Sequence, residues 1–306
     1  MFTPVALPAP STVSAYHGTV AYSRFDGKAF SLVVGGKVAR VATRSVPFDV
    51  DLGPDASGRT VAVYSRCASD PNANFGAGAM SYPDGYAQGC RVFLYDPAVD
   101  RERPVANASG FMPAIWRDTV VYAVGSATGA LYARVGGRTV RLNDGGRSFC
   151  RVNGRCEAGT SVSYSGVDIE GTRVAVAREV GGIGEAGGTQ MVLTGIGRRP
   201  KVVEARENGI SYLAMRFPSL RSGSLYYAET CAGDPGGCSQ TFRRYSSSGV
   251  ESVASSPSSY LTGFAQDGAN AYFVRAPEDH WDKDFRRVCP CRLDVTVPRY
   301  RATSRR

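Results

Sequence analysis

The segment from Val167 to Glu179 predicts two short β-strands joined by a tight turn at Glu170-Gly171. Similar strand–turn–strand units recur along the whole chain. Such units, repeated roughly every 40 to 50 residues, are typical of a β-propeller. No stretch sustains the 3.6-residue period of an amphipathic helix. The repeat therefore restricts the chain to an all-β architecture.

Six copies of the unit can be aligned, and each supplies the first two strands of one blade: 12–23, 48–66, 111–124, 167–178, 211–229 and 260–275. A third strand follows each copy, and usually a fourth. The last blade lacks its fourth strand, which we expect the segment from Phe2 to Leu7 to supply, with Pro4 tolerated at an outer edge. We therefore predict a single six-bladed propeller of four-stranded antiparallel blades over residues 1–298, and a basic tail over 299–306.

The eight cysteines fall into four local pairs: Cys67 and Cys90, Cys150 and Cys156, Cys231 and Cys238, and Cys289 and Cys291. We expect each pair to form a disulfide because each lies within one loop. Such bridges indicate an oxidising compartment, so we predict a secreted or periplasmic, envelope-associated protein. Residues 1–10 lack the basic and apolar regions of a signal peptide, which indicates a mature chain or a mis-set start.

The chain carries a formal charge of +9, and only four of its 36 basic residues are lysine. Arginines cluster in the tail, where they could touch anionic polymers or simply be solvated. Elsewhere the charges alternate in sign and form no basic stripe with interleaved aromatics, so we predict no nucleic-acid partner. No run is long enough to span a membrane. We expect a monomer.

The six units together resemble the TolB-type six-bladed propeller of bacterial envelope and secreted proteins. The typical Ser-Pro-Asp-Gly turn of that family is represented by Gly53-Pro54-Asp55 and Gln266-Asp267-Gly268. The resemblance covers nearly the whole chain and implies the fold. The α/β domain that precedes the propeller in TolB is missing, so TolB's docking to an envelope lipoprotein is not implied.

The innermost strands of a propeller line its central channel. Period-two alternation predicts one layer of small or polar residues at the axis: Ser14, Asp51, Ala114, Gly166, Ala214 and Gly263. The same faces carry further polar and aromatic side chains, and the candidate ligand site comprises Asp49, Asp51, Trp116, Asp168 and Arg216. Repulsion between Asp49 and Asp51 would favour a cation such as Ca²⁺ there. Otherwise the polar groups hold only water.

The remaining motifs give weaker evidence of a function. The glycines at 182, 184 and 187 match G-x-G-x-x-G, but the residues after them predict a strand rather than the helix of a dinucleotide site. No G-x-S-x-G sequence is present. His280 lies among Asp279, Trp281 and Asp282, which an exposed charged loop would also explain. We predict no cofactor.

Two functions remain open. The first is a secreted or envelope-associated, non-enzymatic propeller that binds a protein or a cell-envelope polymer through its loop face. The second is a hydrolase or lyase that acts on a sugar or an anionic substrate at the channel, where carboxylates and an arginine would meet. The absence of a recognisable catalytic set favours the first.

Overall fold

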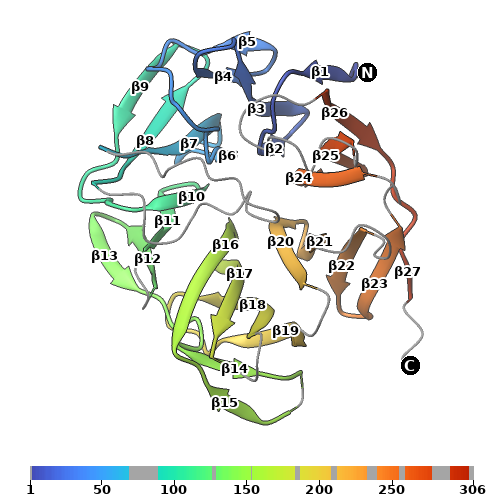
Figure 1. Cartoon of the computed structure of the whole chain (residues 1–306). Coiled ribbons are helices and arrows are strands. Elements are labelled where there is room, and N and C mark those ends of the chain that lie inside the picture. The colour runs from blue at the N-terminus through green and yellow to red at the C-terminus, as the bar shows by residue number, and fades with distance from the viewer. Residues whose placement is uncertain are drawn as a thin grey trace.

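A computed structural model describes residues 2–68, 89–125, 129–152, 154–182, 187–207, 212–232, 240–254, 259–277 and 290–302. In these ranges the strands form six antiparallel sheets that surround one axis as the blades of a propeller (Figure 1). The predicted all-β, six-bladed fold is confirmed. No helix of the described residues is long and apolar enough to cross a membrane.

Each blade is a meander whose first strand lies at the axis. Blade one comprises β2 (Val13–Tyr16), β3 (Thr19–Phe25), β4 (Phe30–Val34) and β5 (Lys37–Val38); blade two β6 (Asp51–Pro54), β7 (Thr60–Arg66), β8 (Arg91–Asp96) and β9 (Arg101–Pro104); blade three β10 (Phe111–Trp116), β11 (Thr119–Val124), β12 (Ala130–Val135) and β13 (Arg138–Arg141).

The second half of the ring repeats this order. Blade four comprises β16 (Ser161–Glu170), β17 (Arg173–Gly181), β18 (Gly188–Gly195) and β19 (Lys201–Glu207); blade five β20 (Tyr212–Arg221), β21 (Ser224–Ala232), β22 (Thr241–Ser246) and β23 (Gly249–Ala254); blade six β24 (Ser259–Asp267), β25 (Asn270–Pro277) and β26 (Cys291–Thr296). Because β18 directly follows the glycine-rich segment, that segment does not open a dinucleotide-binding helix.

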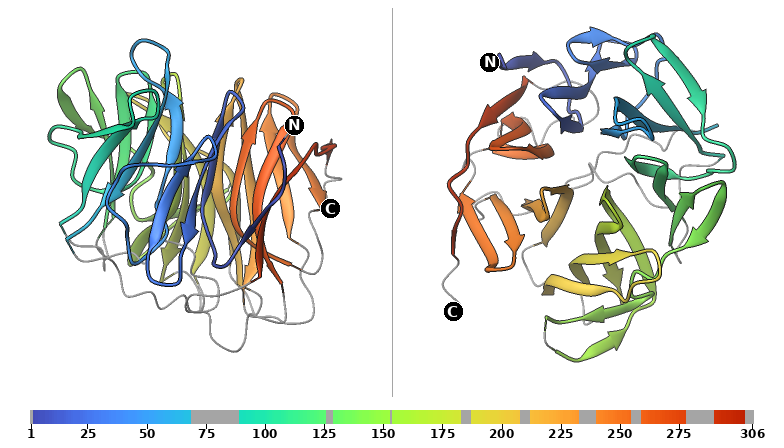
Figure 2. Two further views of the ribbon diagram at one scale, coloured as in Figure 1. Left: turned by 90° about the horizontal axis from the view of Figure 1, so that it is seen from above. Right: turned by 180° about the vertical axis from the view of Figure 1, so that it is seen from behind.

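The two ends of the chain complete the last two blades. Strand β1 (Val5–Leu7) pairs with β26 and supplies the fourth strand of blade six, as predicted. Strand β27 (Arg301–Ala302) pairs with β23 and adds a fifth strand to blade five. Both terminal strands therefore lie at the rim (Figure 2). The domain boundary at residue 298 stays a prediction, although β27 attaches the start of the expected tail to the rim of blade five.

Adjacent blades pack face to face, so the middle strands are apolar on both sides. Strand β11 reads Thr-Val-Val-Tyr-Ala-Val, and its first five residues are buried. The β-branched and aromatic residues of such a strand suit a pleated surface covered on both faces. At the rim this cover ends, and all four residues of β13 are exposed. The core is therefore a ring of inter-blade layers.

The inner strands of blades three, four, five and six each contain a β-bulge. In blades three and five the bulge includes a left-handed residue followed by proline, at Met112 (φ 48°) and Phe217 (φ 55°). A bulge adds one residue and shifts the alternation of the side chains that follow it. This shift changes which residues face the channel.

A small hairpin, β14 (Ser148–Cys150) with β15 (Cys156–Ala158), precedes blade four. The Cys150–Cys156 disulfide crosses it. Arg178 of β17, which is 1% exposed, attaches the hairpin to the blade by donating to the carbonyl oxygens of Gly146 and Ser148 at 2.6 and 2.7 Å. The sequence predicted that Cys150 and Cys156 lie in a loop, and the structure shows that this segment forms two short strands.

Candidate functional site

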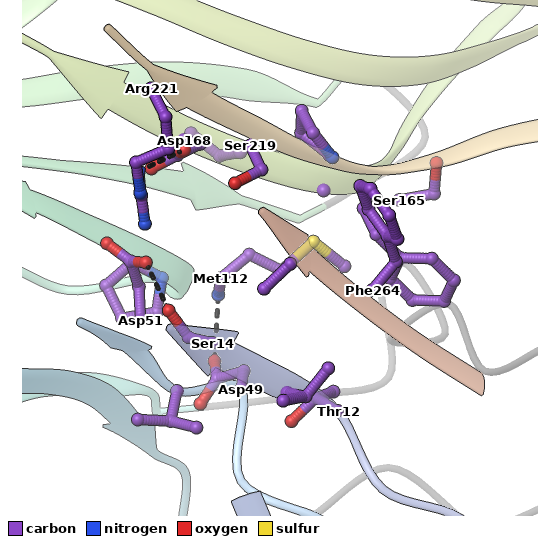
Figure 3. Close-up of a pocket in the computed structure, with 18 residues that line it drawn as sticks. Thr12, Ser14, Asp49, Asp51, Met112, Ser165, Asp168, Ser219, Arg221 and Phe264 are labelled. Carbon is purple, nitrogen blue, oxygen red and sulfur yellow. Dashed lines mark hydrogen bonds and ion pairs between the residues drawn. The ribbon is translucent and has the colours of Figure 1, made fainter. Parts of the chain in front are cut away.

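The predicted aspartates meet at the axis. Asp49, Asp51 and Asp168 all line one cavity of about 90 Å³, together with Ser14 and Arg221 (Figure 3). Each aspartate is at least nine-tenths buried, with 7%, 9% and 3% exposure respectively. Three buried carboxylates are stable only if hydrogen-bond donors or cations offset the loss of their hydration.

Asp51 of blade two links its blade to both neighbours. Its Oδ1 accepts from the Ser14 hydroxyl of blade one at 2.9 Å, and its Oδ2 accepts from the backbone N–H of Ile115 in blade three at 3.0 Å. Ser14 in turn accepts from the Leu52 N–H at 2.9 Å. Burial raises the pKa of Asp51, and Arg221 opposes that rise. Desolvation of the charged form is thus the dominant effect.

Asp168 of blade four makes the same kind of link to blade five. Its Oδ2 accepts from the Leu220 N–H and from Arg221 Nη1, the latter at 3.0 Å, and its Oδ1 accepts from the Ile169 N–H at 2.7 Å. Burial raises the pKa of Asp168 to about 7; Arg221 lowers it, and the nearby Asp51 charge raises it further. One arginine does not fully compensate two desolvated carboxylates.

Arg221 connects three blades. Besides its ion pair with Asp168, it donates through Nη2 to the carbonyl oxygen of Ala15 in blade one, at 3.0 Å. Its guanidinium also lies 5.7 Å from the ring centroid of Tyr16. Burial alone would lower the pKa of Arg221, but Asp168 and Asp51 outweigh it and the pKa is raised. Arg221 is therefore the cation of the axis.

Asp49 has a cation of its own. Its carboxylate lies 3.3 Å from Arg44 Nη1, and both side chains are almost fully buried. It also accepts from the backbone N–H groups of Ser65 and Met112, each at 2.8 Å. The Met112 N–H is the one that the bulge of blade three diverts from the strand ladder. No three His, Cys, Asp or Glu residues of the described ranges are placed to hold a metal ion. Arg44 pairs with Asp49, one of the two aspartates where the sequence suggested Ca²⁺.

Two predicted site residues lie elsewhere. Arg216 does not line the cavity; its Nη2 lies 3.7 Å from Glu179 of blade four. Because of the bulge between Arg216 and Ser219, the residues that share the face of Arg216 further along the strand are Ser219 and Arg221 rather than residues 218 and 220. Strand β20 continues to Arg221, so Ser219 and Arg221, not Arg216, lie at the height of the cavity. Trp116 packs edge-on against Tyr16, with ring centroids 6.2 Å apart, outside the cavity lining. Ala114, Ala214 and Gly263 of the predicted axial layer are also absent from the cavity lining.

Sequence reasoning missed Arg221 because residues 218–223 read as a turn, whereas β20 continues to Arg221. The signal that could have found it is the Ser222-Gly223 pair, which matches the two-residue inner turns of blades one and four. Gly166 lines the cavity as expected, and the Pro218 ring leaves no room for a side chain there, since a Cβ would lie 2.4 Å from its Cδ.

A second set of links lies on the turn face, where the first two strands of each blade are joined. Glu170 of blade four accepts from the N–H groups of Ser222 and Gly223 in blade five, at 2.6 and 2.8 Å. Asp267 of blade six accepts in the same way from His17 and Gly18 of blade one, at 3.1 and 2.6 Å. These carboxylates hold the neighbouring turn. His17 is thus part of a structural contact.

The opposite face, on which second strands end and third strands begin, is called the loop face here. It carries the Cys67–Cys90 disulfide. A hollow of about 690 Å³ lies beside this bridge, between blades two and three, and it is lined by Phe93, Phe111 and Val124 as well as by Arg66 and Arg91. The guanidinium of Arg66 lies 4.0 Å from the ring centroid of Phe93.

Two predicted bridges lie partly beyond the described residues. Cys238 and Cys289 are outside them, so the pairings Cys231–Cys238 and Cys289–Cys291 stay predictions. Cys291 is disulfide-bonded. The charged cluster around His280, with Asp279, Trp281 and Asp282, also falls outside the described ranges.

No protein-family model matches the chain, and no curated protein matches it. Solved propellers resemble it in fold. The β-propeller domain of the Trilobed protease from Pyrococcus furiosus is 12% identical, with a TM-score of 0.47 over 97% of this chain and 100% of that one. The Cps50 (Swd1) propeller of Myceliophteria thermophila is 9% identical, with a TM-score of 0.49 and the same coverage.

An acylaminoacyl peptidase, solved in complex with Z-Gly-Gly-Phe-chloromethyl ketone, is 15% identical, with a TM-score of 0.46 over 88% of this chain. This chain spans 42% of the length of that peptidase. Similarity at this level concerns the propeller fold alone, and none of these structures identifies a TolB relative.

Proposed function

We propose that this propeller is a non-enzymatic binding scaffold, and that its loop face binds a protein or a cell-envelope polymer. The observation that carries the proposal is a contrast in size. The hollow on the loop face measures about 690 Å³ and the axial cavity about 90 Å³. Pockets that enclose a ligand usually measure about 300–1,000 Å³. Of these two cavities, the hollow is the one in that range.

The chemistry of the two places supports the same choice. The axial carboxylates accept hydrogen bonds from Ser14, Ile115 and Leu220 of neighbouring blades, so they stabilise the ring. The hollow instead combines apolar side chains with the cationic groups of Arg66 and Arg91. Such a mixture fits a partner with both apolar and anionic groups.

The setting of the proposal is a secreted or envelope location. The Cys67–Cys90 and Cys150–Cys156 disulfides are consistent with an oxidising compartment. Membership of the TolB type, a bacterial origin and a monomeric state belong to the same proposal. They rest on the blade pattern and the bridges.

One observation favours the second candidate, a hydrolase or lyase acting at the axis. The pKa of Asp168 is raised to about 7, and a carboxyl that is protonated near neutral pH is what a general acid requires. Against it, a sugar ring with its neighbours would not fit a cavity of about 90 Å³. We therefore place this candidate second.

The test compares two tryptophan substitutions. Ser109→Trp would fill the hollow from an exposed position on its rim, and Thr172→Trp would place the same bulk on the turn face. The immobilised wild-type chain and both variants would be exposed to an envelope extract, and any enriched component would then be purified and its affinity measured directly. We expect Ser109→Trp to weaken binding at least about tenfold and Thr172→Trp to leave it unchanged.

Equal binding by all three proteins would reject the hollow as the binding site. The enzyme candidate is tested separately with glycoside and uronide substrates. Turnover that Asp168→Asn abolishes, in a protein that still folds, would replace the scaffold proposal.

A further inference from the structure

Strand β13 is the outermost strand of blade three, and no strand of the described residues covers it (Figure 1). All four of its residues, Arg138-Thr-Val-Arg141, are exposed, and Val140 is 39% exposed. The outer edges of two other blades are blocked. Strand β27 covers β23 of blade five, and Pro104 ends β9 of blade two. Proline and covering strands are common ways to block edge pairing.

The register of β13 leaves its middle backbone groups pointing away from the blade. The Leu142 N–H donates to the Leu131 carbonyl at 2.8 Å, so that pair is hydrogen-bonded. Hydrogen-bonded and non-bonded pairs alternate along an antiparallel ladder. Val140, opposite Ala133, is therefore bonded to β12, whereas Thr139 and Arg141 direct their N–H and C=O groups outward. Two residues thus offer the donors and acceptors that an added strand requires.

Charge identifies the strand that would fit. Arg138 and Arg141 are exposed at the two ends of β13, and neither makes an ion pair within the described part of the chain. Arg134, opposite Thr139 on β12, donates through Nε to the carbonyl oxygen of Ala106, and its Nη1 is buried. The edge therefore presents two guanidinium groups, those of Arg138 and Arg141, that no carboxylate of the described residues neutralises.

Blade five shows that an outer strand of this ring can take a further strand. There β27 adds to β23, with Ala302 opposite Glu251 and Arg301 opposite Ser252. Glu251 is already paired with Arg244, so this addition rests on backbone pairing. At β13, where Arg138 and Arg141 have no carboxylate partner among the described residues, an acidic strand would add charge attraction to the same backbone pairing.

We infer that β13 is a docking site for an extended acidic segment of a partner protein, which adds to blade three as a fifth antiparallel strand. Backbone bonds to Thr139 and Arg141 would fix its register, and its carboxylates, all on one face of the added strand, would lie near Arg141. A second copy of this chain does not suit the site, because its own C-terminal strand is basic and would be repelled. This surface is separate from the hollow on the loop face.

The test uses an acetylated, amidated peptide of about eight residues in which glutamate and valine alternate. We expect the full chain to bind it, and we expect at least about tenfold weaker binding when alternate backbone nitrogens are N-methylated so that they cannot donate to the edge. A lysine–valine peptide of the same length should not bind. Isothermal titration at low salt would measure all three.

Two variants of the chain locate the site. Thr139→Pro removes an outward N–H at an edge position where proline is tolerated, and it should abolish binding without lowering the melting temperature appreciably. Arg141→Glu should do the same by reversing the charge on the face that carries the carboxylates. Arg103→Glu, on the neighbouring edge strand β9, is the matched control and should bind as the wild type does.

Three outcomes would overturn the inference. The first is equal binding of the N-methylated peptide, which would show charge attraction without strand addition. The second is binding that Thr139→Pro leaves intact. The third is a dimer of the wild-type chain that Thr139→Pro dissociates, which would assign the edge to self-association.

Discussion

Blades four and five are joined by two buried ionic clusters that compensate their charges in different ways. At the axis, Asp168 and the nearby Asp51 share one arginine, Arg221, and backbone N–H groups and the Ser14 hydroxyl satisfy the remaining oxygens. Further out, Glu204 and Glu229 are matched by Arg206 and Arg243, so the numbers of charges are equal.

The difference lies in what stabilises each carboxylate. In the outer cluster the compensation comes from side chains, including the hydroxyl of Tyr227, which donates to Glu204. At the axis much of it comes from backbone N–H groups of strands that are already fixed, which costs little side-chain entropy, but one arginine faces two carboxylates. The axis therefore has one cation fewer than the outer cluster. Burial raises the pKa of Asp168, and the nearby Asp51 charge raises it further.

The largest effect is expected from Arg221→Met. The substitution removes the one cation of the axis, leaves two buried carboxylates without an ion pair, and breaks the bond to Ala15 across the ring. We expect a loss of about 3–5 kcal/mol in the free energy of unfolding. Urea denaturation followed by intrinsic fluorescence would measure it.

Arg216→Met is the matched control. Arg216 is as deeply buried, at 5% exposure, but its ion pair is a single contact of 3.7 Å to the partly exposed Glu179. We expect a clearly smaller loss. If the two substitutions cost the same, burial of an arginine rather than its place at the axis would be what matters.

A smaller effect is expected in the outer cluster, from Arg243→Met. Arg206 still reaches both glutamates after this change, so neither carboxylate is left alone. We expect a loss of about 2 kcal/mol, measured by the same denaturation experiment. A loss larger than that of Arg221→Met would contradict the view that the outer cluster has a spare cation and the axis has none.

The sequence predicted the ring better than its centre. Blade order and the closing strand near the N-terminus follow from turn residues and period-two alternation, which act locally. Two of the disulfides follow from cysteines that are close in the sequence. The axis does not, because an added residue at a bulge reverses every later side chain. Asp51 precedes any such shift and was placed correctly. Arg216 and Ala214 were assigned to the channel because the strand was expected to end at Phe217; β20 instead continues to Arg221, and the bulge at Phe217-Pro218 makes Ser219 and Arg221 the residues that face the axis there.

Prolines give a partial signal for these shifts. Pro113 and Pro218 both follow a left-handed residue inside an inner strand, and a proline within a strand indicates an edge or a bulge. The sequence alone does not say which side of the proline carries the extra residue. That choice depends on Asp49, which accepts the diverted Met112 N–H from another blade. Contacts between distant blades therefore decide the register.

The effect that is most specific to the axis is its pH dependence. Because the pKa of Asp168 is about 7 in the folded chain and 3.8 for an ordinary aspartate, the folded state binds this proton more tightly than the unfolded state does. The stabilisation from this group is therefore complete below about pH 4 and is lost as the pH rises through 7. One carboxyl contributes a slope of at most about 1.4 kcal/mol per pH unit.

Denaturation at several pH values between 5 and 7.5 would measure this slope. Asp168→Asn should flatten it, whatever the variant does to absolute stability. Asp26→Asn should leave it unchanged, because hydrogen bonds from the Ala29 and Lys28 N–H groups lower the pKa of Asp26 and keep its titration below this window. A slope that survives Asp168→Asn would mean that the excess negative charge of the axis is neutralised by something other than protonation of this carboxyl, and the contrast with the outer cluster would then fail.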